Sequence, residues 1–266
     1  MRDIHISIVS HGQGAYVHRL LEDLCVLSSA SRLQVSVVLN IPESQGDSFS
    51  ETHFPVRIVR NATPRGFGEN HNLAFHTAPC PDERAFFVVL NPDLRLREDG
   101  VGALADQLMT HDSIGVVAPA VYSPQDVLED SARELPTPIG LLRKVFGRKG
   151  GQNTEGGGLP FFPDWVAGMF MMFPVDVFSQ IGGFDESYFL YYEDVDICSR
   201  LWISGYSVVL DPGHSIVHDA QRTSHKSWRY ARWHLVSIAR FLSSRVFRRA
   251  RRLHRTRVGR PHYANH

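Results

Sequence analysis

The sequence predicts an α/β protein in which a mostly parallel central sheet is flanked by helices. Residues 3–10 alternate apolar and polar side chains, as in a strand, and residues 15–27 have helical periodicity before a second strand at 33–39. A strand, a helix and a strand of these lengths form a βαβ unit, which requires parallel pairing and a covering helix. The continuous apolar run 85–90 is typical of a strand buried on both faces.

The remaining expected elements continue this pattern. Further strands are expected at 56–59, 114–118, 164–173, 206–210 and 214–218. Further helices are expected at 73–78, 101–109, 175–181, 195–204 and 227–246. Residues 123–163 have no periodicity, and the glycine-rich part 147–158 predicts a lid, a binding loop or a disordered segment that is mobile before substrate binds.

Composition indicates an ordinary globular protein and excludes several classes. A chain of 266 residues, 43% of them hydrophobic and 21% charged, can form one large α/β domain or two small ones. Three widely spaced cysteines without a CxxC pair predict neither a disulfide framework nor a thiolate zinc site, and they fit a reducing cytosol. The start, 1–5, lacks the apolar core of a signal peptide, and the longest apolar run, 165–173, is too short to span a bilayer. We therefore expect a cytoplasmic protein that is not integral to a membrane.

Zero net charge hides a strong asymmetry along the chain. Residues 220–266 hold 13 of the 28 lysines and arginines and no acidic residue, so residues 1–219 hold 15 basic against 28 acidic side chains. The helix expected at 227–246 has an apolar stripe with arginines largely elsewhere. Arginine clusters with tryptophan and phenylalanine nearby suit an anionic membrane surface, and nucleic acid is the competing anion. No recognised nucleic-acid-binding fold precedes this tail, so we expect a membrane partner and no nucleic acid.

Acidic and aromatic residues gather between residues 182 and 196. A Gly-Gly turn opens this stretch, and five carboxylates are interleaved with aromatic rings. Aromatic side chains seek the interior, whereas clustered carboxylates resist burial unless something positive or protonated joins them. We therefore expect a concave site in which one carboxylate is tuned as a general base. The alternative is a solvated acidic turn before an ordinary amphipathic helix.

Polar side chains follow the first two expected strands. Ligands of parallel sheets bind beyond the carboxyl ends of the strands, which places Ser10, His11 and Asn40 at a candidate nucleotide site. Gly12 and Gly14 lack the third glycine of a dinucleotide-binding fingerprint, so NAD is not expected.

Two later segments are candidates for holding phosphate and metal. Arg65 and Gly66 precede a helix start that a phosphate can approach closely, although a plain loop before a surface helix fits as well. Asp93 stands at the tip of a buried strand, where a carboxylate can hold a divalent cation together with substrate phosphates. A turn aspartate is the alternative there. His218 lies downstream of the carboxylates and could complete a metal site with Asp93.

Seven segments, taken in order, resemble the family 2 glycosyltransferases. They are Ile8–His11, Gly66–Gly68 with Asn70 and Asn72, Leu90–Asp93, Trp165–Gly168, Gly182–Glu186, Tyr191–Asp196 and His218. Within that family they resemble bacterial rhamnosyltransferases that act on polyprenyl-diphosphate-linked N-acetylglucosamine in O-antigen or cell-wall assembly. The resemblance reaches the segment 232–235. It implies the GT-A fold, a nucleotide-diphosphate-sugar donor, Mg²⁺ or Mn²⁺, and inversion of the anomeric centre.

The resemblance also implies roles for single residues. Asp194, beside Glu193, matches the general base, while Asp93 and His218 match metal ligands. Asn91 replaces the first aspartate of the family's Asp-x-Asp motif and leaves fewer anionic ligands. Nucleotide binding is assigned to Ser10, His11, Asn40, Arg65, Gly66, Asn91 and Asp93, and acceptor binding to Trp165, Gly168, Asp185 and Tyr191.

These assignments predict an inverting, metal-dependent enzyme that moves rhamnose from dTDP-β-L-rhamnose to a polyprenyl-diphosphate-linked acceptor at the inner face of the cytoplasmic membrane. The expected division is a GT-A domain at 1–219, with a nucleotide-sugar half at 1–120, a loop at 121–163 and an acceptor half at 164–219, followed by a basic helix and tail at 220–266. A UDP-hexose donor, a nucleotidyltransferase and a non-catalytic sugar-nucleotide-binding protein are the alternatives. A nucleotidyltransferase would need a basic phosphate loop after the first strand, where no lysine or arginine occurs before Arg19.

Overall fold

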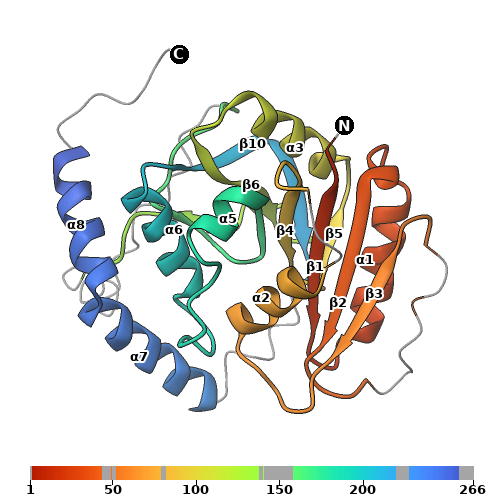
Figure 1. Ribbon diagram of the computed structural model, residues 1–266, viewed down its shortest axis with the longest axis horizontal. Helices are drawn as coiled ribbons and strands as arrows, with labels where there is room; N and C mark the ends of the chain where they lie inside the picture. The colour runs from red at the N-terminus through yellow and green to blue at the C-terminus, as the bar shows by residue number, and fades with distance from the viewer. Residues whose placement is uncertain are drawn as a thin grey trace.

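An eight-stranded sheet forms the centre of the molecule (Figure 1). The computed structural model describes residues 2–43, 49, 52–78, 82–137, 140, 158–219 and 228–257, with only the backbone for 255–257. In spatial order the strands are β3 (Val56–Arg60), β2 (Leu33–Leu39), β1 (Ile4–Ser10), β4 (Phe86–Leu90), β9 (Phe170–Pro174), β6 (Ile114–Tyr122), β10 (Ser207–His218) and β5 (Leu94–Leu96). A second sheet pairs β7 (Ala132–Arg133) with β8 (Trp165–Val166).

The pairing is mostly parallel, as the sequence predicts. β1 pairs in parallel with both β2 and β4, β2 pairs in parallel with β3, and β6 pairs in parallel with β10. β9 runs antiparallel between β4 and β6, and β5 is an antiparallel edge strand on β10. The carboxyl ends of β1 to β4 therefore meet at one edge of the sheet, where ligands of such folds bind.

Helices cover both faces of the sheet. On one face, α1 (Gly14–Cys25) and α3 (Gly100–Thr110) bury leucines and valines against the isoleucines of β1, and a short 3₁₀ helix, η1 (Ala30–Arg32), precedes β2. The other face is covered by α2 (Phe67–Thr77), α5 (Val175–Gln180) and α6 (Glu193–Ile203), whose aromatic and aliphatic side chains pack with those of β4 and β9. Both faces of β4 are thus buried, as its continuous apolar sequence predicts.

Two C-terminal helices lie along one side of the molecule, beside α6 (Figure 1). They are α7 (Trp228–Ser243) and α8 (Arg245–Arg257). Phe241, Phe247 and Ala250 are buried there in a third apolar cluster, together with Tyr188 and Tyr192. The expected single helix 227–246 is wrong, because the helix ends at Ser243 and the arginine run that follows forms a helix of its own. Within the described residues, no helix is long and apolar enough to cross a membrane.

Three other expectations about elements are also wrong. The strand expected at 164–173 is divided between the two sheets, β8 and β9, because residues 167–169 leave the extended conformation and bind Ser131, Asp194 and Asn91. Helix α2 begins at Phe67, with Gly66 as its N-cap, and not at Leu73. The two short strands expected at 206–210 and 214–218 form one strand, β10, with a register shift between Asp211 and Ser215. Most of the loop expected at 147–158 lies outside the described residues.

Candidate functional site

Three asparagines join the carboxyl ends of β2 and β3 to the start of α2. The Asn40 side chain accepts a hydrogen bond from the Arg65 N–H at 2.8 Å and donates one to the Arg65 carbonyl at 3.0 Å. Asn61 donates to Asn40 at 2.8 Å and to Asn70 at 2.6 Å, and Asn70 donates to the Gly66 carbonyl at 2.8 Å. The turn that carries Arg65 and Gly66 is therefore fixed against two strand ends.

The end of β1 carries a second polar cluster. Ser10 donates to the carboxylate of Glu43, and that carboxylate also accepts from the Gly14 N–H at 3.0 Å. His11 is exposed, with its Nδ1 3.3 Å from the Asn40 amide nitrogen. The structure thus brings together Ser10, His11, Asn40 and, through the Asn40 contacts, Arg65, which the sequence assigns to one nucleotide site.

Helix α2 meets the segment before α6 through backbone atoms. The Phe67 N–H donates to the Phe189 carbonyl at 2.8 Å. A Cβ built on Gly66 would lie 2.9 Å from the Phe189 oxygen and 3.0 Å from the Tyr188 oxygen. Only glycine leaves room for this approach, because no real Cβ contact is so short without displacement of the neighbour.

Asn72 fixes the turn that opens the acidic stretch. Its side chain accepts from the Phe184 N–H at 2.9 Å and donates to the Phe184 carbonyl at 2.9 Å and to Glu186 at 3.0 Å. Asn72 itself is buried. Two residues apart on α2, Asn70 holds the strand-end network and Asn72 holds this turn, so one helix positions both.

Asp93 and His218 face each other across the pair β5–β10. His218 Nε2 lies 3.3 Å from Asp93 Oδ2, and His218 Nδ1 lies 2.8 Å from Glu129 Oε2. Burial lowers the pKa of His218, but the hydrogen bonds to Asp93 and Glu129 outweigh it and raise the pKa to about 9. Asp93 Oδ1 is buried and has no hydrogen-bond partner.

These residues fit a divalent cation that is held partly by substrate. One carboxylate and one imidazole can present two ligands when a cation displaces the proton that Asp93 and Glu129 hold on His218. Glu129 orients the imidazole through its other nitrogen, and the unpaired Asp93 oxygen is available to a cation. The described residues contain no group of three or more His, Cys, Asp or Glu side chains arranged as a complete metal site. Donor phosphates would supply the remaining ligands, as is usual for Mg²⁺.

Glu193 and Asp194 form the first turn of α6. The two residues before them, Tyr191 and Tyr192, have left-handed φ angles of 71° and 69°. This is unusual for bulky side chains, and such backbone conformations cluster at functional sites. The Asp194 carboxylate accepts from the Val195 N–H at 2.8 Å and from the Gly168 N–H at 3.3 Å.

The electrostatics of this pair suit proton transfer. Burial raises the pKa of Asp194, and its two backbone hydrogen bonds partly oppose that shift. Burial and the neighbouring Asp194 charge raise the pKa of Glu193, whose Oε2 is buried without a hydrogen-bond partner. A carboxylate whose pKa is raised toward neutrality is a better proton acceptor, so this arrangement can perform general-base chemistry.

The base and the metal-site turn are joined by two successive residues. The Gly168 N–H donates to Asp194, and the carbonyl of the next residue, Met169, accepts from the Asn91 N–H at 2.9 Å. Asn91 begins the turn that carries Asp93. The Gly168–Met169 pair therefore places the candidate base next to the candidate metal turn.

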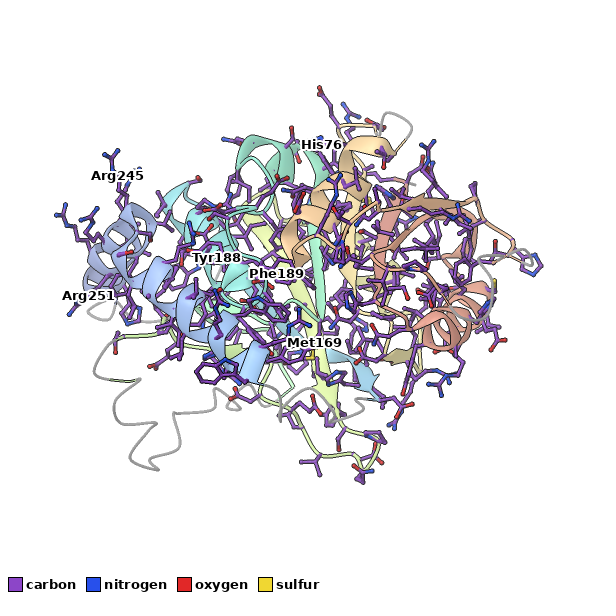
Figure 2. The ribbon with its side chains drawn as sticks, turned by 90° about the horizontal axis from the view of Figure 1, so that it is seen from below. His76, Met169, Tyr188, Phe189, Arg245 and Arg251 are labelled. Atoms are coloured by element: carbon purple, nitrogen blue, oxygen red, sulfur yellow. The ribbon has the colours of Figure 1, made fainter. Side chains whose placement is uncertain are left out.

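Helix α7 holds the strained tyrosine turn from the outside. Ser237 donates to the Leu190 carbonyl at 2.9 Å, and the His234 ring lies 5.2 Å from Tyr191 and 5.7 Å from Tyr192. Trp233 packs on Phe189 with ring centroids 4.7 Å apart. Figure 2 shows Tyr188 and Phe189 between α7 and the body of the molecule.

The expected acceptor residues come from three segments of the chain, and Trp165 and Tyr191 pack against the same apolar cluster. Trp165 begins β8, Gly168 lies on the connection between β8 and β9, and Tyr191 precedes the base. Asp185 is exposed and accepts a hydrogen bond from the Ser187 N–H, so it closes a local turn. Of the five carboxylates of 182–196, Asp185 and Glu186 are exposed, whereas Glu193, Asp194 and Asp196 are buried or partly buried on α6.

Several residues of this site were not assigned from sequence. Asn61 follows a strand end as Asn40 does, and that position is the signal that could have identified it. Glu43, Glu129 and Arg133 lie in segments without periodicity, and no local pattern marks them. His234 lies within the segment 232–235 of the resemblance.

Comparison with known proteins identifies a family. The model of glycosyl transferase family group 2 matches residues 87–261. Rhamnosyltransferase WbbL of Escherichia coli (strain K12) is 27% identical over 256 residues, which cover 90% of this chain and 92% of the relative. An N-acetylglucosaminyl-diphospho-decaprenol L-rhamnosyltransferase of Mycobacterium tuberculosis (strain ATCC 25618 / H37Rv) is 26% identical over 261 residues, covering 86% of this chain and 79% of the relative.

Solved structures share the fold. GalNAc-T7 with UDP, GalNAc and Mn²⁺ aligns over 82% of this chain with a TM-score of 0.61 and 13% identity. The mannosyltransferase PcManGT from Pyrobaculum calidifontis, with GDP-Man and Mn²⁺, aligns over 89% with a TM-score of 0.60 and 17% identity. The aligned part spans 44% and 64% of those two chains. The expected GT-A fold is thereby confirmed.

Proposed function

Because the chain belongs to glycosyl transferase family group 2, we propose that it moves rhamnose from dTDP-β-L-rhamnose to polyprenyl-diphosphate-linked N-acetylglucosamine, with inversion of the anomeric centre. The chain is a glycosyltransferase, and the relatives named as rhamnosyltransferases support the sugar. The name of the mycobacterial relative supports the acceptor class. One observation carries the proposal: the Gly168–Met169 pair binds the base turn with one backbone group and the Asp93 turn with the other.

In this proposal Asp194 takes the proton from the attacking acceptor hydroxyl. The Val195 and Gly168 N–H groups orient its carboxylate, and burial raises its pKa. Burial and the Asp194 charge raise the pKa of Glu193, so Glu193 stays protonated to higher pH than an exposed glutamate. In its neutral form it places no second negative charge beside the base. Direct displacement needs such a base on one side of the anomeric carbon and charge neutralisation on the other.

The leaving diphosphate would lie at the Asp93 side. Asp93 and His218 would hold Mg²⁺ or Mn²⁺, and Glu129 would fix the imidazole tautomer. A divalent cation there neutralises the charge that develops on the departing diphosphate. Structural relatives solved with Mn²⁺ support this assignment. Ser10, His11, Asn40, Arg65 and Gly66, with Asn91, would bind the nucleotide part of the donor.

The C-terminal helices would bind an anionic membrane surface at the cytoplasmic face. Trp228, Leu235 and Val236 on α7 are 78%, 61% and 53% exposed, an unusual exposure for large apolar side chains. Figure 2 shows Arg245 and Arg251 of α8 extending away from the body. Apolar side chains beside arginines match an interfacial helix on anionic lipid, and the lipid-linked acceptor lies in that surface. We retain residues 1–219 as the catalytic domain and 220–266 as this membrane-binding part.

The first test is calorimetric titration with dTDP and with UDP, each with Mn²⁺ and with EDTA. We expect tighter, metal-dependent binding of dTDP; preference for UDP would move the proposal to a UDP-hexose donor. Asp194→Asn should then retain dTDP binding and lose rhamnosyl transfer about 10²- to 10⁴-fold. The exposed Asp112→Asn variant is the matched control. Normal transfer by Asp194→Asn would refute the base assignment, and dTDP binding without any transfer by the wild type would favour a non-catalytic binding protein.

A further inference from the structure

A small two-stranded sheet, β7 with β8, leads into the segment that contacts the base. Arg133 of β7 is paired with Trp165 of β8, and its guanidinium carbon lies over the Trp165 ring, 5.3 Å from the centroid. This sheet is continuous with the segment that contacts Asp194, since the Ala167 N–H donates to the Ser131 carbonyl and the Gly168 N–H donates to Asp194. The sheet therefore fixes Arg133 and Trp165 beside the base.

The positive charge of Arg133 reaches the base turn. Burial is the largest effect on the pKa of Asp194 and of Tyr192 and raises both, while the charge of Arg133 lowers both. The other charged or titratable groups that face Asp194 are Glu193 on its own helix turn and Cys198, one turn further along α6. Among the described residues, Arg133 is thus the cation whose charge acts on both Asp194 and Tyr192.

The guanidinium is only partly satisfied within the protein. Arg133 Nε forms an ion pair with Asp130 Oδ2 at 2.7 Å but has no hydrogen-bond partner, and the Arg133 side chain is 36% exposed. By contrast, Arg200, another arginine near the base helix, donates to Asp196 at 2.7 Å and to the Ile181 carbonyl at 2.6 Å. Each arginine has one buried nitrogen without a hydrogen-bond partner, but Arg133 is 36% exposed and can meet an anion from solvent, whereas Arg200 is 19% exposed and has a structural role.

The chemistry of the acceptor defines which anion belongs there. The base must contact one hydroxyl of the acceptor sugar, and the diphosphate is attached to the anomeric carbon of that same ring. Arg133 is paired with Trp165, three residues before the Gly168 that donates to Asp194, so the guanidinium and the base lie on adjoining segments of the site. A planar guanidinium that stacks on an aromatic face is suited to bind phosphate oxygens through two donors.

We propose that Arg133, held on Trp165, binds the diphosphate of a sugar-diphosphate acceptor and so selects acceptors that carry this group. This inference rests on the proposed acceptor class and adds the residue that recognises it. Trp165 keeps the guanidinium in place and offers an aromatic edge beside the sugar.

The test compares two acceptors that differ only in the diphosphate. One is N-acetylglucosamine linked through diphosphate to a short alkyl chain, and the other is the alkyl glycoside of the same sugar. Arg133→Gln should raise KM for the first about 10- to 100-fold, leave KM for the second within about twofold, and change kcat little. Arg133→Lys should recover part of the loss, and Arg84→Gln, an exposed arginine before β4, is the control.

Two results would overturn the inference. Equal losses with both acceptors, with the acid limb of the pH profile moved to higher pH, would show that Arg133 acts only on the ionisation of Asp194. Unchanged KM for the diphosphate acceptor would show that it binds elsewhere. Equilibrium binding of the diphosphate compound to wild type and Arg133→Gln separates this inference from the proposed function. Weaker binding by Arg133→Gln, without rhamnosyl transfer by the wild type, would refute the proposed reaction and support the diphosphate site. Equal affinity of the wild type and Arg133→Gln would refute the site.

Discussion

Gly66→Ala tests whether close contact between α2 and the base segment sets the catalytic geometry. Gly66 has φ −66° and ψ 165°, which alanine adopts without strain, so only the added methyl group matters. That methyl would lie 2.9 Å from the Phe189 oxygen, 3.0 Å from the Phe189 Cα and 3.0 Å from the Tyr188 oxygen. All three are backbone atoms, so no side-chain rotation can relieve the contact.

The magnitude follows from these distances. Favourable contacts of this kind lie near 3.5–4.0 Å, so the segment before Tyr191 must retreat by about 0.5–1 Å. Such a shift would weaken the hydrogen bond from the Phe67 N–H to the Phe189 carbonyl and displace the turn that aims Asp194. Misplacement of about 1 Å can lower a rate about 10²-fold, so we expect kcat to fall about 10- to 100-fold. Overpacking should lower the free energy of unfolding by about 1–3 kcal/mol.

The assay is steady-state rhamnosyl transfer, with urea denaturation of the same preparations. Gly100→Ala is the matched control, since its added Cβ would lie 3.5 Å from the His214 Cβ, an ordinary contact. Its kcat should equal that of the wild type. If Gly66→Ala also kept the wild-type kcat, the contact would have no part in placing the base, and the reasoning would be wrong.

Three further predictions concern other parts of the molecule. Asn72→Ala should lower the free energy of unfolding by about 2–4 kcal/mol in urea denaturation, because it leaves both backbone groups of Phe184 without partners. A free energy of unfolding within about 0.5 kcal/mol of the wild type, the usual spread of surface substitutions, would show that the Asn72 hydrogen bonds do not hold this turn. Glu129→Gln should lower the Mn²⁺-dependent gain in dTDP affinity about 10- to 100-fold, because Glu129 no longer orients His218. Calorimetry would measure this gain, and an unchanged gain would show that Glu129 does not support a metal site. Burial lowers the pKa of His71 from 6.5 to about 3, so the stability due to its neutral form is present above pH 6.5 and is lost as the pH falls toward 3. Over this range His71 contributes about 1.4 kcal/mol per pH unit to the fall in the free energy of unfolding. In urea denaturation from pH 7 to pH 4, the free energy of unfolding of His71→Gln should therefore fall less steeply than that of the wild type.

The sheet could be predicted because its signals are local. The apolar run that becomes β4 and the alternating run that becomes β1 need no information from elsewhere in the chain. The errors occur where tertiary contacts override the local pattern. Residues 164–173 have the composition of one strand, yet the chain leaves the sheet at 167–169, where Gly168 and Met169 bind other segments. Helix α2 begins early because Gly66 is needed at its N-cap for the approach to Phe189.

The candidate site was predictable residue by residue but not as contacts. The types and positions of Asp93, Asp194 and His218 indicate chemistry, and the structure brings Asp93 and His218 together. The partners that orient them are distant in sequence and chemically ordinary: Glu129 is 89 residues from His218. A carboxylate in an irregular segment has no local feature that distinguishes a side chain that orients a metal ligand from one that is merely solvated. Such residues become visible only when the fold places them.

Three glycines in the segments that resemble the glycosyltransferase family lie where those segments contact one another. Added Cβ atoms would lie 2.6 Å from Phe184 at Gly68, 3.1 Å from Phe67 at Gly168 and 2.5 Å from Asn72 at Gly183. Each glycine therefore allows close packing that a side chain would prevent, where α2 contacts either the turn at 183–184 or the connection that binds Asp194. The three contacts share α2 as a common support, so a shift at one moves the surfaces of the others. Substitutions at these glycines should consequently be non-additive, because the base is placed by a single packed unit.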